Sequence, residues 1–345
     1  MIYTTLPNTD IKISKICLGT MTFGQQNTED EAHQQLHYAV EQGINFIDTA
    51  EMYSIPGKKE TQGSTERYIG TWLKDQKRED LIVATKITGP LEYFNYIRND
   101  LGFSKIVIRD AIEKSLKRLQ TNYIDLYQLH WPERNVNFFG QRYYKHDANE
   151  KWQDNFKDVI ETLDDLVKEG KIRHYGVSNE SSWGVMRHLT ESKANNFTRC
   201  KTIQNAYSLL NRTFEINLSE VSLRENVGLL AYSPLAFGML SGKYLNGQMP
   251  EGSRLKLFPS YSRYSNFQSH SVTQKYLELA RKNDLSLAQM SLAFVNQQPF
   301  VTSNIIGATT MDQLKENIAS INIELSEEIL NEIDVINELQ PNPAP

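Results

Sequence analysis

The sequence predicts an α/β fold, a single (β/α)8 TIM barrel, and three observations lead to this fold class. Apolar strand-like runs recur eight times along 345 residues, helical patterns lie between most of them, and no two-residue hairpin turn joins consecutive runs. Such alternation implies a parallel sheet with right-handed crossovers. A doubly wound open sheet alternates in the same way, but eight uninterrupted strands favour the barrel. No GxGxxG follows the first run, where a dinucleotide-binding open sheet requires it. We therefore expect residues 1–345 to form one barrel domain.

Each predicted strand is a short apolar run that ends near a polar or small residue. The runs are residues 16–19, 45–48, 81–86, 124–130, 174–179, 202–207, 227–233 and 303–308. Residues 1–14 alternate in polarity around PNTD, which predicts an N-terminal β-hairpin that closes the bottom of the barrel.

Caps and periodicity predict the helices between the strands. Thr28 and Glu31 have the spacing of a capping box, and Gly43 suits a left-handed residue at the end of that helix. Ser104 is a candidate N-cap for a second amphipathic helix, and Gly170 ends a third, which begins near residue 156.

Composition excludes several classes of function. The net charge of −5 and the pI near 5.9 give no support for binding to nucleic acid or a membrane surface. No basic run, membrane-spanning apolar stretch or signal-peptide pattern is visible, which predicts a cytoplasmic protein. Cys17 and Cys200 lie far apart, without a metal-ligand pattern, and are expected to be reduced and buried.

Three long connections follow strands and therefore belong at the carboxyl end of the barrel, where barrel active sites lie. They are residues 87–103, 131–155 and 248–271. The first two are rich in aromatic residues, which argues against disorder and for a role at the site.

Ionisable residues stand at the ends of three adjacent predicted strands. Asp48, Lys86 and His130 occupy these positions, and Tyr53 follows the first of them. Each residue alone has an ordinary structural explanation, such as a helix cap, a solvated charge or a loop anchor. Because adjacent strand ends lie side by side, we expect all four to converge at one rim of the barrel.

The four residues suit proton donation to a carbonyl oxygen. A free tyrosine has a pKa of about 10, and a neighbouring lysine ammonium is expected to lower that pKa. Asp48 keeps Lys86 charged, and His130 can hold the carbonyl oxygen. The hydride that completes a carbonyl reduction must come from a cofactor, because no side chain supplies one.

Three stretches carry a family resemblance. GINFIDTAEMY, ATK and LYQLHWP resemble the aldo-keto reductase superfamily, and within it the Tas-type bacterial aldo-keto reductases. The resemblance continues through KIRHYGVSNE, IQNAYSLLNR and GKYLNG to GATTMDQLKENI, over nearly the whole chain. It implies an NADP(H)-dependent barrel with Asp48, Tyr53, Lys86 and His130 as the catalytic tetrad and Tyr53 as the proton donor.

The same resemblance implies a set of cofactor-binding residues. These are Gly19, Thr20, Met21, Ser178, Asn179, Gln204, Tyr232, Ser233, Pro234, Leu235, Ala236, Phe237, Gly238, Ser241, Gly242, Lys243, Tyr244, Arg254, Gly307, Thr309, Gln313, Glu316 and Asn317. Gln313 stands where many family members carry an arginine for the 2′-phosphate. Lys243 and Arg254 can take over that role, which favours NADPH over NADH.

A small-molecule carbonyl compound with an apolar or aromatic body is the expected substrate. The predicted pocket residues are Met21, Tyr53, Trp131 and aromatic residues of the 132–155 loop such as Phe138, Phe139, Tyr143 and Tyr144. Apolar walls of this kind suit such a ligand. We expect a monomer or weak homo-oligomer.

Two other functions fit the same fold. Related barrels serve as NADP-binding regulatory subunits of potassium channels, which sense redox state with little turnover. A catalytically idle barrel that acts as a binding partner is the other alternative, and it predicts a damaged tetrad. The intact tetrad favours an NADP(H)-dependent reductase of aldehydes or ketones.

Overall fold

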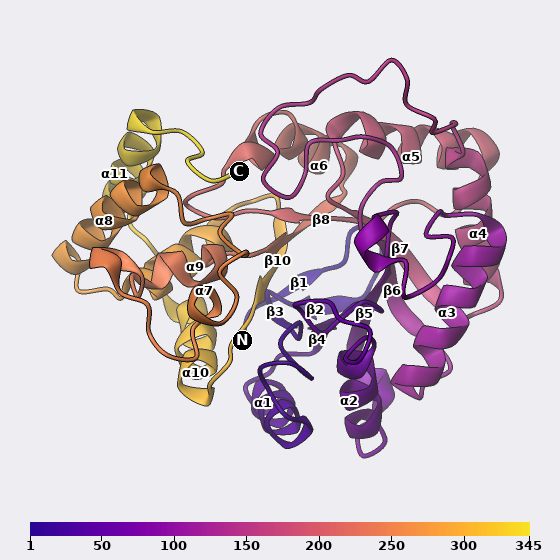
Figure 1. The fold of residues 1–345 in the computed structure, drawn as a ribbon, viewed down its shortest axis with the longest axis horizontal. Helices are drawn as coiled ribbons and strands as arrows, with labels where there is room; N and C mark the ends of the chain where they lie inside the picture. The colour runs from indigo at the N-terminus through magenta and orange to yellow at the C-terminus, as the bar shows by residue number, and fades with distance from the viewer.

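Eight parallel strands close into a barrel at the centre of the molecule (Figure 1). In the computed structural model, which describes residues 1–345, the order around the barrel is β10-β3-β4-β5-β6-β7-β8-β9. The strands are β3 (Ile16–Gly19), β4 (Phe46–Asp48), β5 (Ile82–Ile87), β6 (Ile124–Leu129), β7 (Ile172–Ser178), β8 (Thr202–Ala206), β9 (Gly228–Tyr232) and β10 (Val301–Ile306). Ile305 of β10 pairs with Cys17 of β3 and closes the ring. The predicted barrel and its eight strands are confirmed.

Helices surround the barrel on its outer face, as the alternating sequence pattern predicts (Figure 1). They are α1 (Glu29–Glu41), α2 (Ser64–Leu73), α3 (Lys105–Leu119), α4 (Phe156–Lys168), α5 (Ser182–Asn195), α6 (Leu218–Glu225), α7 (Arg254–Leu257), α8 (Phe267–Lys282), α9 (Leu287–Gln297), α10 (Met311–Ala319) and α11 (Glu327–Leu339). Short 3-10 helices lie at Arg78–Asp80, Glu92–Phe94, Thr213–Glu215, Ala236–Ser241, Leu245–Gly247 and Ser320–Asn322. None of the helices is both long enough and apolar enough to cross a membrane.

The predicted helix ends are largely correct. Thr28 and Glu31 form both bonds of a capping box at the start of α1, and Gly43 adopts a left-handed conformation (φ 86°) just after it. Gly170 does the same after α4 (φ 74°). Ser104 stands at the N-cap of α3, as predicted, although its side chain bonds no backbone amide there.

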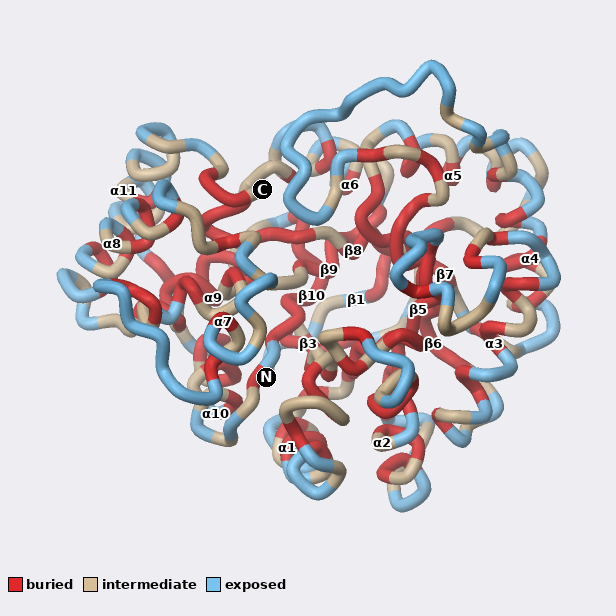
Figure 2. Tube along the Cα trace, viewed as in Figure 1, coloured by how far each residue is buried: buried red, intermediate tan, exposed pale blue.

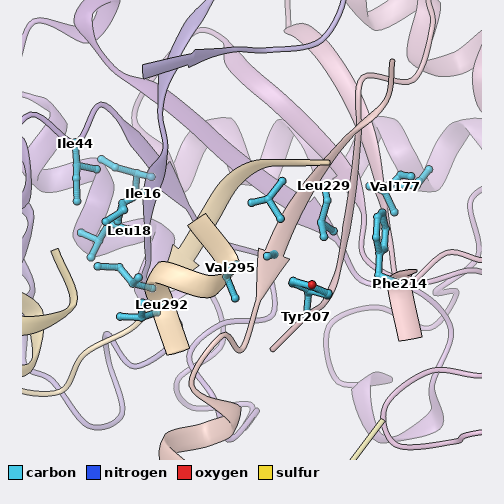
Figure 3. Close-up of a cluster of buried hydrophobic side chains, with 14 of the residues drawn as sticks. Ile16, Leu18, Ile44, Val177, Tyr207, Phe214, Leu229, Leu292 and Val295 are labelled. Atoms are coloured by element: carbon cyan, nitrogen blue, oxygen red, sulfur yellow. The ribbon is translucent and has the colours of Figure 1, made fainter. Parts of the chain in front are cut away.

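The main core fills the layer between the strands and the helices. Ile16, Leu18, Tyr207, Leu229 and Val295 belong to it and are at most 1% exposed (Figure 3). Figure 2 shows the buried segments along the strands and along the inner faces of the helices. Every second strand residue points outward into this layer, which leaves the alternate positions to face the barrel interior.

The N-terminal hairpin seals one end of the barrel interior. β1 (Tyr3–Thr5) pairs antiparallel with β2 (Lys12–Ser14), as predicted. Leu6 and Ile13 are at most 1% exposed and pack in a separate apolar cluster with inward-facing strand residues such as Phe46. The interior is thus apolar at the hairpin end, and its polar side chains lie at the opposite end.

The long connections differ in how firmly they are packed. Residues 137–149 are mostly exposed and form a long excursion at the top of the view in Figures 1 and 2. In contrast, residues 87–103 contain a short 3-10 helix and several buried side chains. Residues 248–271 hold α7 and the start of α8.

We predict that Ile13→Ala lowers the free energy of unfolding by about 2–5 kcal/mol, because it leaves a cavity under the barrel. Urea denaturation measures this change. Ile2→Ala is the matched control, since Ile2 is 56% exposed beside the same hairpin. Equal stability losses in the two variants would contradict a sealing role for Ile13.

Candidate active site

A large cleft of about 800 Å³ opens at the carboxyl ends of the strands. Its walls come from the βα connections, and its floor includes Asp48, Tyr53 and His130. The cleft thus lies where the strand-end residues were expected to converge.

The deepest polar contact of the cleft is an ion pair between adjacent strands. Lys86 Nζ donates to Asp48 Oδ2 over 2.6 Å and to the backbone oxygen of Thr49 over 2.7 Å. The Lys86 side chain is 0% exposed, and that of Asp48 is 4% exposed. Burial alone lowers the pKa of Lys86, but the attraction of Asp48 and Tyr53 outweighs burial, and the pKa is raised. Lys86 is therefore charged at neutral pH.

Two glutamines complete the surroundings of Asp48. Gln204 Nε2 donates to Asp48 Oδ1 over 2.8 Å, and Gln128 Nε2 donates to the same oxygen over 3.2 Å. Gln204 was expected to contact the cofactor, and here its amide contacts the carboxylate. Gln128 was not predicted from the sequence, although it precedes His130 by two residues and therefore faces the same interior.

Tyr53 lies directly above this ion pair. Lys86 Nζ is 5.0 Å from the centre of the Tyr53 ring, and the rings of Tyr53 and His130 meet edge to face with centroids 5.8 Å apart. The four predicted residues therefore meet at one point, although they come from three strands and one connection.

Burial controls the pKa values of both ring groups. Burial raises the pKa of Tyr53 above 10, and the opposing effect of Lys86 is smaller, so the expected net lowering is wrong. Burial, with Lys86 adding to it, holds the pKa of His130 well below 6.5. Tyr53 is thus a protonated donor and His130 a neutral imidazole at neutral pH.

The end of β7 is tied to the same site through a chain of hydrogen bonds. Ser178 Oγ donates to the backbone oxygen of Gln204 over 2.7 Å, and Asn179 Nδ2 donates to the backbone oxygen of His130 over 2.8 Å. Tyr232 at the end of β9 donates its hydroxyl proton to Asn179 Oδ1 over 2.6 Å. These residues form a pre-ordered polar edge beside Tyr53 and His130.

Two cations line the far part of the cleft without any anionic partner. Lys243 and Arg254 make no ion pair or side-chain hydrogen bond, and the Arg254 guanidinium stacks 4.6 Å from the centre of the Phe237 ring. Burial, and the repulsion of Arg254, lower the pKa of Lys243. Cations without a counter-charge in a cleft are the kind of groups that attract an anion such as phosphate.

Most of the residues expected to bind a cofactor do line the cleft. These are Gly19, Thr20, Met21, Ser178, Asn179, Gln204, Tyr232, Ser233, Pro234, Leu235, Phe237, Gly238, Ser241, Lys243, Arg254, Gly307, Thr309, Gln313, Glu316 and Asn317. Ala236, Gly242 and Tyr244 do not line it. Ala236 and Tyr244 are 1% exposed and pack in the core behind it, because Phe237 and Gly238 bend the chain through left-handed conformations there.

Gln313 is already engaged by its own loop. Its Oε1 accepts hydrogen bonds from the backbone amide and the hydroxyl of Thr309, over 3.0 and 3.1 Å. The residue that replaces the usual arginine therefore braces the start of α10 through its side-chain oxygen.

The substrate side of the cleft is apolar and aromatic. Met21, Tyr53, Trp131 and Phe139 line it as expected. Phe138, Tyr143 and Tyr144 do not, since Phe138 packs behind Trp131 while Tyr143 and Tyr144 are more than half exposed. The connection after β5 supplies further wall residues that were not predicted, namely Leu91, Tyr93 and Phe94.

The sequence matches a known protein family over most of its length. The family model described as the aldo/keto reductase family matches residues 15–338. The chain belongs to this family.

Several known proteins are similar to this chain over most of its length. It is 51% identical to Protein tas of Escherichia coli strain K12, over all of both chains. It is 34% identical to the uncharacterized oxidoreductase YrpG of Bacillus subtilis, over all of this chain and 97% of that one. It is 27% identical to norsolorinic acid reductase B of Dothistroma septosporum, over 95% and 79% of the two chains. The reductase is therefore an oxidoreductase of the aldo/keto type.

We predict that the His130 ring stays neutral at pH 6.5 and above, because burial and Lys86 disfavour its charged form. NMR titration of the histidine ring signals measures this, with His130→Gln assigning the signal. A His130 signal that titrates near the ordinary pKa of about 6.5 would contradict the prediction.

Proposed function

We propose that this protein reduces aldehydes or ketones to alcohols with NADPH, and that Tyr53 is the proton donor. The observation that carries the proposal is the fully buried Lys86, bonded to Asp48 and lying beneath Tyr53 at the floor of an apolar cleft. A buried ion pair of this kind offers no stability that an apolar pair would not match. The position of the ion pair beneath the Tyr53 phenol instead indicates a role in proton donation by that phenol.

The chain's own residues provide the proton half of the reaction. When bound, NADPH supplies the hydride. Tyr53 donates its phenolic proton to the carbonyl oxygen, and Lys86 stabilises the phenolate that remains. Asp48 keeps Lys86 charged and in place, since it is the only ion-pair partner of the ammonium group.

His130 orients the carbonyl oxygen rather than supplying the proton. Its pKa is well below 6.5, so the ring is neutral and has one N–H to donate. The backbone oxygen of His130 is held by Asn179, which fixes the position of the residue beside Tyr53. Two donors, a phenol and an imidazole, thus converge on one point of the cleft.

The residues of the cleft fit a nicotinamide dinucleotide that carries an extra phosphate on its ribose. Ser178, Asn179 and Tyr232 form the polar edge next to the reacting groups, where a nicotinamide amide finds partners. Lys243 and Arg254 lie beyond them and lack any counter-charge, which suits an extra phosphate on the ribose. This favours NADPH over NADH.

The walls suit a small carbonyl compound with an apolar or aromatic body. Trp131, Phe94, Leu91 and Phe139 surround the space next to Tyr53. Large apolar rings bind such a body by burying its surface, and they offer no partner to a strongly polar one.

We predict that Tyr53→Phe lowers kcat at least about 100-fold, because it removes the general acid. The Kd for NADPH should change less than about 3-fold, since the phenolic oxygen is not among the proposed cofactor contacts. Absorbance at 340 nm against a panel of aromatic and aliphatic carbonyls measures turnover, and fluorescence titration measures binding.

The matched control is Tyr144→Phe, since Tyr144 is 54% exposed and lies off the cleft. Undiminished turnover in Tyr53→Phe would contradict the role of Tyr53. Tight NADPH binding by the wild type without turnover of any carbonyl would indicate a redox sensor instead.

We predict that Arg254→Gln raises the Kd for NADPH by about 10-fold or more and the Kd for NADH by less than about 3-fold, because a charge-assisted phosphate contact contributes about 1.5–3 kcal/mol. Lys256→Gln is the matched control, since Lys256 belongs to the same short helix but already pairs with Glu251 at 3.4 Å. An equal rise in the Kd for NADPH and for NADH in Arg254→Gln would refute the proposal that Arg254 selects the 2′-phosphate.

A further inference from the structure

A second buried ion pair lies behind the substrate side of the cleft. Glu51 stands between Asp48 and Tyr53 in the sequence, and its carboxylate receives both terminal nitrogens of Arg98, with Arg98 NH1 2.9 Å from Oε1. The side chains of Glu51 and Arg98 are 1% and 9% exposed. Neither residue lines the cleft, so neither is a candidate to touch a ligand.

Glu51 uses all of its polar groups to connect neighbouring segments. Its backbone amide donates to the oxygen of Lys86 over 3.2 Å, and its backbone oxygen accepts from Gln62 Nε2 over 2.6 Å. Its Oε1 also accepts from the backbone amide of Thr88 over 2.7 Å. The turn that carries Tyr53 is thus anchored to β5 whether or not Arg98 is present.

Arg98, in contrast, depends on Glu51 alone. Its Nε is buried without a hydrogen-bond partner, and both of its terminal nitrogens go to the Glu51 carboxylate. Arg98 lies in the middle of residues 87–103, the connection that places Leu91, Tyr93 and Phe94 on the cleft. The ion pair therefore ties this connection to the Tyr53 turn.

The same connection interlocks with the rim loop that follows Tyr53. Tyr93 donates its hydroxyl proton to the backbone oxygen of Gly57 over 2.5 Å. A Cβ on Gly57 would stand 2.7 Å from the Phe94 ring and 2.9 Å from the Tyr96 hydroxyl, so only glycine permits this close approach. The two loops form one packed wall.

The wall continues to the strand end that carries His130. Trp131 donates Nε1–H to the backbone oxygen of Pro90 over 3.2 Å, and its ring lies 5.7 Å from that of Phe94. Phe94 and Trp131 share an apolar cluster with Met52, separate from the main core. This satellite cluster is small, so it offers little apolar burial to hold the connection without the ion pair.

We propose that Arg98, through its ion pair with Glu51, is a positioning residue that sets the aromatic wall of the substrate pocket and thereby the preference for aromatic over small aliphatic carbonyls. The proposal rests on the proposed carbonyl reduction. It follows from the geometry that releasing Arg98 frees the wall but leaves Tyr53, Lys86 and the cofactor edge in place. An aromatic substrate then loses its packed surface, whereas a small aldehyde loses almost nothing.

Arg118 provides a matched control for a merely structural role. Its Nε donates to Glu66 over 2.6 Å, and the two side chains are 15% and 0% exposed, much like the Arg98–Glu51 pair. Glu66 also accepts from Thr85 over 2.6 Å, on the outer side of β5 and away from the cleft. Removing either arginine leaves a buried glutamate without its ion-pair partner, but only Arg98 touches the wall.

The first experiment compares Arg98→Met and Arg118→Met with the wild type, using benzaldehyde and propanal as substrates and NADPH at saturation. For Arg98→Met we expect the KM for benzaldehyde to rise about 10-fold, the cost of about 1.4 kcal/mol of lost contact, with kcat for both substrates changed less than about 3-fold. Arg118→Met should leave the benzaldehyde-to-propanal ratio of kcat/KM unchanged. An unchanged ratio in Arg98→Met, or an equal change in both variants, would overturn the proposal.

A conservative variant and a measurement that needs no turnover extend the test. Arg98→Lys keeps the charge but lacks the bidentate contact with Glu51. Its KM for benzaldehyde should therefore lie between those of the wild type and Arg98→Met. Hydrogen exchange followed by mass spectrometry should show faster exchange across residues 88–97 in Arg98→Met and unchanged exchange there in Arg118→Met. Absent turnover in the wild type defeats the proposed function, whereas unchanged exchange in Arg98→Met defeats the positioning role.

Discussion

The buried pair of Lys86 and Asp48 is the constraint on which the rest of the site depends. An ammonium that is 0% exposed needs a counter-charge within hydrogen-bond reach, and removing one partner of such a pair costs about 3–5 kcal/mol. Asp48 in turn accepts from Gln128 and Gln204, which reach it from β6 and β8. The ion pair and its two glutamine partners therefore come from four strands. This network forms only when the barrel closes.

Buried arginine–glutamate pairs extend this order to the connections around the mouth. Arg98 and Glu51 join the connections after β5 and β4, and Arg134 and Glu180 join those after β6 and β7, with Arg134 NH1 3.0 Å from Glu180 Oε2. Each pair lies within a few residues of a group at the floor. Connections that carry function need a rigid support, and here paired charges provide it where apolar burial is small.

The floor of the cleft can be predicted from the sequence, whereas its walls cannot. Strand periodicity places Asp48, Lys86 and His130 at strand ends, and parallel pairing brings such ends together whatever the details of packing. No comparable rule predicts which residues of the long connections form the walls of the cleft. Tyr143 and Phe94 are both aromatic residues in long connections, yet Tyr143 is 70% exposed and Phe94 lines the cleft. Which one turns inward depends on contacts with Gly57 and Trp131, which lie far away in the sequence.

The sequence by itself determined the barrel, the hairpin at its closed end and the identity of the four convergent residues, because apolar runs, helix caps and short motifs are local properties of the chain. The tertiary structure alone decided how those residues ionise. Lys86 was expected to lower the pKa of Tyr53, and burial raises it instead, because the desolvation of the phenol exceeds the attraction of the ammonium. Tertiary packing also decided which connection forms the wall of the pocket. Burial and long-range contacts depend on residues that are distant in the sequence, so no local sequence pattern predicts them.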